Sequence, residues 1–266
     1  MAHPLLSDVT TLLTFFQTPA SGHGPVVHFP DDAASYVKVI LRWAHFVAGI
    51  TWIGLLYFFN AVNVPFQKQL DAPTKGKVVP ALMPNALWYF RWGALVTVLV
   101  GLAYYGSYIL ATDAHNGGAN AFAILGIWLL IILVTYTIVF FVTKPDGPLS
   151  KGNVLAIVIA IIVIVMAAVI VMFMGSYPGI GNKTISIGIG GGLGIIMLAN
   201  VWSIIWPAQR RIIAWTKAYA ENGTPIPPEA AKLGRRAFLA SRTNAWLSLP
   251  MLFFMAASHD FIMFGR

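Results

Sequence analysis

The sequence predicts an all-α integral membrane protein, built as a bundle of about six transmembrane helices. Of its 266 residues, 58% are hydrophobic and only 10% are charged, and the mean hydropathy is +0.75, whereas soluble domains average roughly 25% charged residues. Apolar stretches long enough to cross a hydrocarbon layer of about 30 Å recur along the chain. We expect helices rather than barrel strands, because backbone groups in lipid must be satisfied internally and the sequence has no period-two alternation.

Six stretches have the required length of roughly 20 residues. They are about 37–60, 86–111, 119–143, 153–174, 185–206 and 244–264, and segments rich in Gly, Pro and charged residues separate them. Together they form one predicted transmembrane domain, 37–264. The preceding segment, 1–36, lacks the basic start of a signal peptide, and we expect it to be extramembrane or interfacial.

The distribution of Lys and Arg predicts the orientation of the bundle. Twelve of the 17 follow the first, third or fifth stretch, namely Lys68, Lys75, Lys77, Lys144, Lys151, Arg210, Arg211, Lys217, Lys232, Arg235, Arg236 and Arg242. Cytoplasmic loops of membrane proteins carry an excess of these residues. Both termini are therefore expected on the outside of a bacterial inner membrane that the chain crosses several times.

The longest connection, 207–243, is expected to be cytoplasmic and helical. Ala208–Glu221 and Glu229–Arg242 both have the composition of helices, and Pro228 stands at the start of the second. Their mixture of basic and apolar residues suits helices that lie on an anionic inner leaflet. A docking surface for a cytoplasmic partner is the alternative.

Composition and motifs exclude several classes of function. The chain has no cysteine, so disulfides, iron–sulfur clusters and covalently attached c-type haem are not expected within it. The formal charge of +8 is spread over the loops without a basic module, which gives no indication of nucleic-acid binding. Hydrolysis and phosphoryl transfer are not expected either, because we find no nucleotide-binding loop, nucleophile motif or intramembrane carboxylate pair.

Two histidines, His45 and His259, lie within the predicted spans. Each is about 7–11 Å below the outer end of its helix, given a rise of 1.5 Å per residue. Neutral imidazoles from two facing helices can hold the iron of haem b, while the macrocycle fills an apolar gap between the helices. The first and last helices are thus predicted to form a haem b site with His45 and His259 as the metal ligands.

Neighbouring residues fit such a site. Arg42, one turn above His45, points toward the outer interface, where a haem propionate needs a cation. Gly49, one turn below His45, leaves room for the edge of a porphyrin, and Trp52 continues the same face. Met255 shares a stripe of the last helix with His259 and is a fallback ligand.

From the residues alone, three interpretations of these groups stay open. The first is the haem site. In the second, the imidazoles only hydrogen-bond neighbouring helices and Arg42 extends to the lipid headgroups. The third is a path for protons or ions.

The fifth stretch contains small residues four positions apart. They are Gly188 with Gly192 and Gly190 with Gly194. This spacing predicts close helix packing, and a flat cofactor can use the same bare surface. Asn200, further along this stretch, needs a hydrogen-bonding partner in the membrane, and Asn60 or Asn63 lies at a similar predicted depth.

Four segments resemble one known family, the membrane domain at the N-terminus of bacterial cytochrome c-dependent urate oxidases. The segments are "LRWAHFVAGITWIG" (41–54), "LWYFRWGAL" (87–95), "GLGIIMLANVWSIIWPAQRR" (192–211) and "SLPMLFFMAASHDF" (248–261). The resemblance implies a multi-helix membrane domain, commonly followed by a periplasmic c-type cytochrome domain. Since the chain has no cysteine, we expect a separate electron acceptor. His45 and His259 fall within the similar segments.

The chain departs from the family pattern at two places. Trp88, Arg91 and Gly93 replace a stretch that carries His and charge, and 243–245 replaces a His-Asn-Asn run. These substitutions remove polar groups that a purine needs.

The expected function is that of a membrane electron-transfer subunit. It would bind haem b and exchange electrons with a c-type cytochrome or with a partner redox subunit of a respiratory complex. One alternative is a non-catalytic membrane subunit that anchors or stabilises a larger complex. The other is an oxidoreductase of the urate oxidase type.

Overall fold

The computed structural model describes residues 29–30 and 32–264, and all regular secondary structure in that part of the chain is helical. The chain divides into two units, Met1–Val37 and Lys38–Arg266. The predicted segment 1–36 lies almost entirely outside the described residues. Within the first unit, Asp32 caps a helix, because its carboxylate accepts a hydrogen bond of 2.8 Å from the backbone N–H of Ser35.

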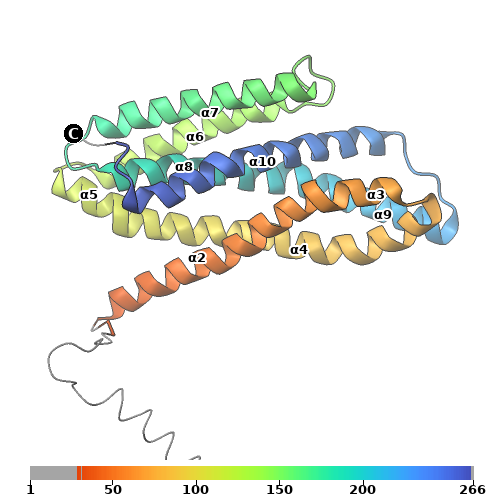
Figure 1. Ribbon diagram of the computed structural model, residues 1–266, viewed down its shortest axis with the longest axis horizontal. Coiled ribbons are helices and arrows are strands. Elements are labelled where there is room, and N and C mark those ends of the chain that lie inside the picture. Colours follow the sequence, from red (N-terminus) through yellow and green to blue (C-terminus); the bar gives the residue numbers. More distant parts are fainter. Residues whose placement is uncertain (1–28, 31, 265–266) are drawn as a thin grey trace, which may run out of the picture. The chain divides into compact units, whose positions relative to one another are not determined.

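The α-helices follow one another with three π-helical segments among them (Figure 1). In order they are α2 (Ala33–Tyr57), η1 (Phe58–Asn63), α3 (Val64–Gln69), α4 (Ala72–Tyr104), η2 (Tyr105–Leu110), α5 (Ala111–Asn116), α6 (Ala121–Val142), α7 (Gly152–Gly175), α8 (Asn182–Asn200), η3 (Val201–Ile205), α9 (Trp206–Asn222) and α10 (Glu229–Asp260). Each π-helical segment joins two α-helices without a break.

Five helical runs in the described residues are long and apolar enough to cross a membrane. They are Ala33–Gln69, Ala72–Asn116, Ala121–Val142, Gly152–Gly175 and Asn182–Asn222. These runs make the chain a multi-pass membrane protein. The sixth predicted span, 244–264, lies mainly in α10. This helix is less apolar because it buries the polar side chains of Thr243, Asn244 and Ser248.

The helices extend past the predicted spans at the end of the bundle that carries most of the Lys and Arg. α4 begins at Ala72, after Asp71 accepts a hydrogen bond of 2.8 Å from the backbone N–H of Thr74. It then continues through Pro80 and Pro84. The sequence predicts a break between helices here, because proline commonly ends or kinks a helix.

Helices α9 and α10 fill most of the connection predicted at 207–243. α9 follows α8 through η3, and only 223–228 separates α9 from α10. Gly223 ends α9 with a φ of 69°, a left-handed conformation that favours glycine. α9 packs against α4, where a Cβ on Gly76 would lie 2.9 Å from Ala220. These helices therefore bury one face against each other, and their predicted position on a lipid leaflet stays a prediction.

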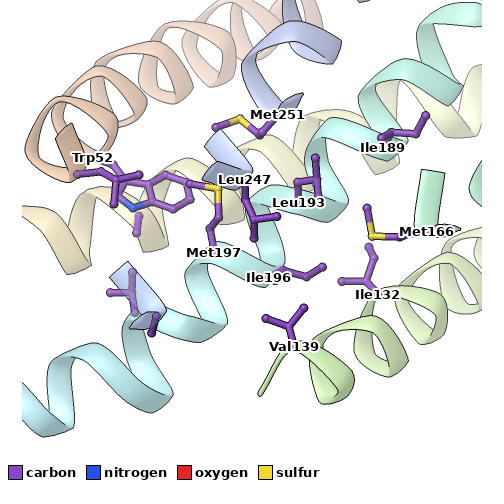
Figure 2. Packing of buried hydrophobic residues seen from close by; sticks show 14 of the residues in the cluster. Trp52, Ile132, Val139, Met166, Ile189, Leu193, Ile196, Met197, Leu247 and Met251 are labelled. Atoms are coloured by element: carbon purple, nitrogen blue, oxygen red, sulfur yellow. The ribbon is translucent and has the colours of Figure 1, made fainter. Parts of the chain in front are cut away.

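Helix α8 lies at the centre of the core. In its most apolar part 72% of the residues are buried, against 11 to 28% in the other four runs. Figure 2 shows its side chains Ile189, Leu193, Ile196 and Met197 among those of Trp52 from α2, Ile132 and Val139 from α6, Met166 from α7, and Leu247 and Met251 from α10. The apolar side chains of α8 thus pack among those of all four of these helices.

The prediction that the α8 glycines allow close packing is confirmed for Gly190 and Gly192. A Cβ on Gly192 would lie 3.2 Å from the side chain of Ile132 on α6. A Cβ on Gly190 would lie 3.1 Å from the backbone oxygen of Met251 on α10. Both separations are shorter than ordinary van der Waals contact, so that larger residues would push these helices apart.

The predicted partner of Asn200 is wrong. Its Nδ2 donates a hydrogen bond of 2.8 Å to Oδ1 of Asn244 on α10, rather than bonding to Asn60 or Asn63. Asn60 instead donates to the Ser241 hydroxyl at 2.9 Å. Depth along the membrane gives the height of a side chain but not the direction in which its helix turns it, and α8 turns Asn200 toward α10.

Candidate cofactor site

A cavity of about 760 Å³ lies among α2, α4, α8 and α10, with contributions from η2 and α6. Pockets for small molecules and cofactors typically measure about 300–1,000 Å³. All six predicted site residues line it, namely Arg42, His45, Gly49, Trp52, Met255 and His259. The structure therefore brings the first and last helices to one cavity.

Helix α4 holds the His45 imidazole in a defined position. Nδ1 lies 2.9 Å from the backbone oxygen of Thr97. Because a carbonyl can only accept, Nδ1 carries the proton, and in the neutral imidazole Nε2 then keeps its lone pair. Nε2 has no hydrogen-bond partner among the described residues. Histidines that bind metals commonly donate their other N–H to a carbonyl in this way.

The absence of a side chain at Gly101 makes room for that imidazole. A Cβ on Gly101 would lie 2.8 Å from both Cε1 and Nδ1 of His45. Two other small residues bring α2 and α4 together nearby: a Cβ on Gly93 would lie 3.3 Å from the Ala48 oxygen, and one on Gly49 would lie 3.6 Å from the Thr97 methyl group. The crossing of the two helices thus fixes where His45 lies.

The remaining α2 residues differ in exposure. Trp52 is 1% exposed, and its indole Nε1 is buried without a hydrogen-bond partner in the described structure. Figure 2 shows its ring extending toward Met197 of the core. Arg42 is exposed, and it has no ion pair with a described carboxylate. Its charge is available to an anionic group at the mouth of the cavity.

Helix α10 supplies Met255 and His259. Met255 packs on the bare face of α8, since its Cε would lie 3.3 Å from a Cβ on Gly190. His259 is exposed in the last turn of α10, and its Nδ1 lies 2.9 Å from the Ser258 hydroxyl. Ser258 also donates a hydrogen bond to the Met255 oxygen.

Glycines form the α8 wall of the cavity. Gly190, Gly191 and Gly194 line it, and nothing lies within 4 Å of the place of a Cβ on Gly194. Trp128 bounds the wall and donates from Nε1 to the Gly188 oxygen at 3.0 Å. A wall of bare backbone suits a flat apolar ring.

Several lining residues were not predicted. Thr97, Gly101 and Tyr105 are spaced four apart on one face of α4 and η2, and Trp128 comes from α6. An isolated glycine in a long apolar helix, four residues after a threonine, is a signal of close approach that could have found Gly101.

The side chains that line the cavity fit a metal ion that a macrocycle already holds, such as the iron of a haem. No group of three or more His, Cys, Asp or Glu that could hold a metal ion occurs in the described part of the chain. A haem needs only one or two axial ligands from the protein, because the porphyrin supplies the other four donors. One imidazole nitrogen with its lone pair, a second histidine, a nearby cation and a flat apolar wall meet those needs.

The fold and the cavity define a multi-pass helical membrane protein with an intramembrane site of cofactor size. The sequence profile of the urate oxidase N-terminal family matches residues 70–266. The chain belongs to this family. No curated protein and no solved structure matches it. The matched region includes the α8 wall, Met255 and His259, while α2 with His45 precedes it.

Proposed function

We propose that this chain is a membrane electron-transfer subunit that binds haem b in the cavity among α2, α4, α8 and α10. It would exchange electrons with a c-type cytochrome or a partner redox subunit. Membership of the urate oxidase N-terminal family relates the chain to an oxidoreductase. The observation that carries the proposal is the imidazole of His45, whose Nδ1 bonds to the Thr97 oxygen while Nε2 is left for a ligand.

Each lining residue has a role in this proposal. Nε2 of His45 would be one axial ligand and His259 the other, with Met255 as the alternative to His259. Arg42 would pair with a propionate at the outer interface. The glycines of α8 would accept the face of the ring. When bound, haem would supply reversible one-electron chemistry, whose potential depends on axial ligands and burial.

An absorption spectrum tests this proposal. We expect the purified chain, expressed with haem supplied, to give a b-type reduced-minus-oxidised spectrum, because the proposed haem is bound without covalent attachment and has protein side chains as its axial ligands. His45→Ala should abolish the spectrum. The matched control is His115→Ala, which removes a histidine of α5 that does not line the cavity. A colourless wild-type protein would sink the proposal.

Urate oxidation is a second candidate, favoured by the family to which the chain belongs. Residues at which the chain departs from the family pattern, such as Arg91 and Asn244, do not line the cavity. Arg91 lies instead with its guanidinium 3.8 Å from the Trp206 ring, and Asn244 bonds to Asn200. Membranes that contain the chain should reduce added cytochrome c when urate is present. A rate no higher than that of empty membranes would rule urate out.

A further inference from the structure

A second cavity, of about 660 Å³, lies where α6 ends and α10 begins. The last turn of α6, the connection 143–151 and the first two turns of α10 line it. Figure 1 shows this connection and the start of α10 at the same end of the bundle. This end of the bundle carries most of the Lys and Arg. The second cavity shares no lining residue with the cavity that contains His45.

Five charged side chains line this cavity, and its two carboxylates are already paired. Asp146 forms an ion pair with Lys232. Glu229 Oε1 lies 2.5 Å from the Arg211 guanidinium. The negative charges of the cavity are therefore neutralised. The other two cations that line it, Lys144 and Arg236, take no part in these ion pairs.

Lys144 and Arg236 have no carboxylate partner among the described residues. Each lies on an aromatic ring instead: Nζ of Lys144 is 4.4 Å from the Phe141 ring, and Cζ of Arg236 is 4.6 Å from the Phe140 ring. Nε of Arg236 is buried without a hydrogen-bond partner. Two cations at one cavity, with an unused buried donor, are the features of a site for an anion.

The start of α10 adds to this positive potential. α10 runs from Glu229 to Asp260; no side chain caps its first turn, although the Ala230 N–H donates to the Pro227 oxygen at 3.0 Å. The N-terminus of a helix carries a partial positive charge and unpaired N–H groups, which favour oxyanions. The helix terminus and the two cations thus act on the same cavity.

We propose that this cavity binds the phosphate of an anionic phospholipid. The apolar helices that border it favour a lipid over a free phosphate. Phe141 at the end of α6, which lines the cavity, is 56% exposed. Acyl chains can lie along these surfaces while the headgroup reaches the cations. Basic pockets at the ends of transmembrane helices recognise anionic headgroups in this way.

Thermal unfolding of the full chain in a non-ionic detergent tests this proposal. Phosphatidylglycerol should raise the midpoint temperature, whereas phosphatidylcholine and inorganic phosphate at the same concentration should not. In the double variant Lys144→Gln, Arg236→Gln, the concentration of phosphatidylglycerol needed for half of the effect should rise about tenfold, since charge-assisted contacts to the phosphate are lost.

The matched control is Lys77→Gln, Arg210→Gln, which removes the same charge from exposed positions outside this cavity. This control should keep the wild-type response. An equal loss in both double variants would mean diffuse surface charge and would overturn the proposal. An equal effect of inorganic phosphate would overturn the assignment to a lipid.

A variant that fails to fold does not prevent the test. Native mass spectrometry of the wild-type chain should detect phosphatidylglycerol retained through purification in preference to phosphatidylethanolamine. Equal retention of the two lipids would count against the site. Lys144→Arg with Arg236→Lys keeps both charges, and this variant should keep the lipid as well.

Discussion

At the scale of single residues, helix α4 holds the His45 imidazole on two sides. The Thr97 oxygen selects the tautomer, and the bare Cα of Gly101 leaves the space that the ring occupies. A hydrogen bond to a carbonyl raises the basicity of the opposite nitrogen as well as orienting the ring. Thr97 and Gly101 are therefore positioning residues for His45.

Gly101→Ala should displace the imidazole without harm to the fold. The new Cβ would lie 2.8 Å from the His45 ring, so the ring must move. Alanine is the better helix former by about 1 kcal/mol, which offsets the crowding. We expect haem content to fall severalfold while the thermal midpoint of the chain without haem stays close to that of wild type. Absorption per mole of protein measures the first quantity.

Gly126→Ala is the control for that change. Gly126 also lies within a helix, and nothing is within 4 Å of the place of its Cβ. Its haem content should equal that of wild type. Wild-type haem binding by Gly101→Ala would show that the position of the ring is unimportant.

The histidines stand out in the sequence because polar side chains are rare in apolar helices. Of their supports, Gly101 left a weak signal, whereas Thr97 is an ordinary residue whose role depends on how α2 and α4 cross. The pairing of Asn200 failed for the same reason: a span predicts depth, but only packing determines the rotation of each helix. Asn244 of α10 satisfies that amide.

At the scale of elements, some glycines of α8 pack against a neighbouring helix and others face the cavity. Gly192 faces Ile132 of α6 at close range, whereas Gly194 faces the cavity with open space around it. The sequence shows equivalent glycine pairs, and the structure gives them different environments. Gly192 and Gly194 lie on different faces of one helix and therefore serve two purposes.

Leucine at these two positions should have different effects, one on stability and the other on haem content. Gly192→Leu would overpack the contact with Ile132 and should destabilise the chain by about 1–3 kcal/mol. Gly194→Leu should leave stability close to wild type but fill the cavity and lower the haem content. Unfolding midpoints and absorption spectra of both variants measure these effects. The same loss of stability in both would contradict the assignment of Gly194 to the cavity.

The extent of the helices was the least predictable feature at this scale. Hydropathy detects the part of a helix that contacts lipid, and it loses the helix where the composition becomes polar. α4 therefore begins at Ala72 rather than near 86, and it passes through Pro80 and Pro84. Packing of α4 against α9 compensates for the weak intrinsic preference of this segment for a helix.

At the scale of the whole molecule, the charge distribution predicts that the connection after α7 is outside and that the end of α9 is inside. The chain has no cysteine, so one introduced thiol reports on one position. Ser176→Cys and Asn222→Cys both replace exposed polar residues at helix ends. A membrane-impermeant maleimide should label Ser176→Cys in intact cells and Asn222→Cys only after lysis. The reverse pattern would invert the predicted orientation.

One continuous helical run, Asn182–Asn222, carries both the glycine wall of the cavity and the whole of α9. A run of 41 residues is about 60 Å long at 1.5 Å per residue. The π-helical segment η3 and Pro207 lie where α8 passes into α9, and helices bend most readily at such places. A change in the angle at η3 would therefore move α9 relative to the glycine wall without breaking the chain of helices.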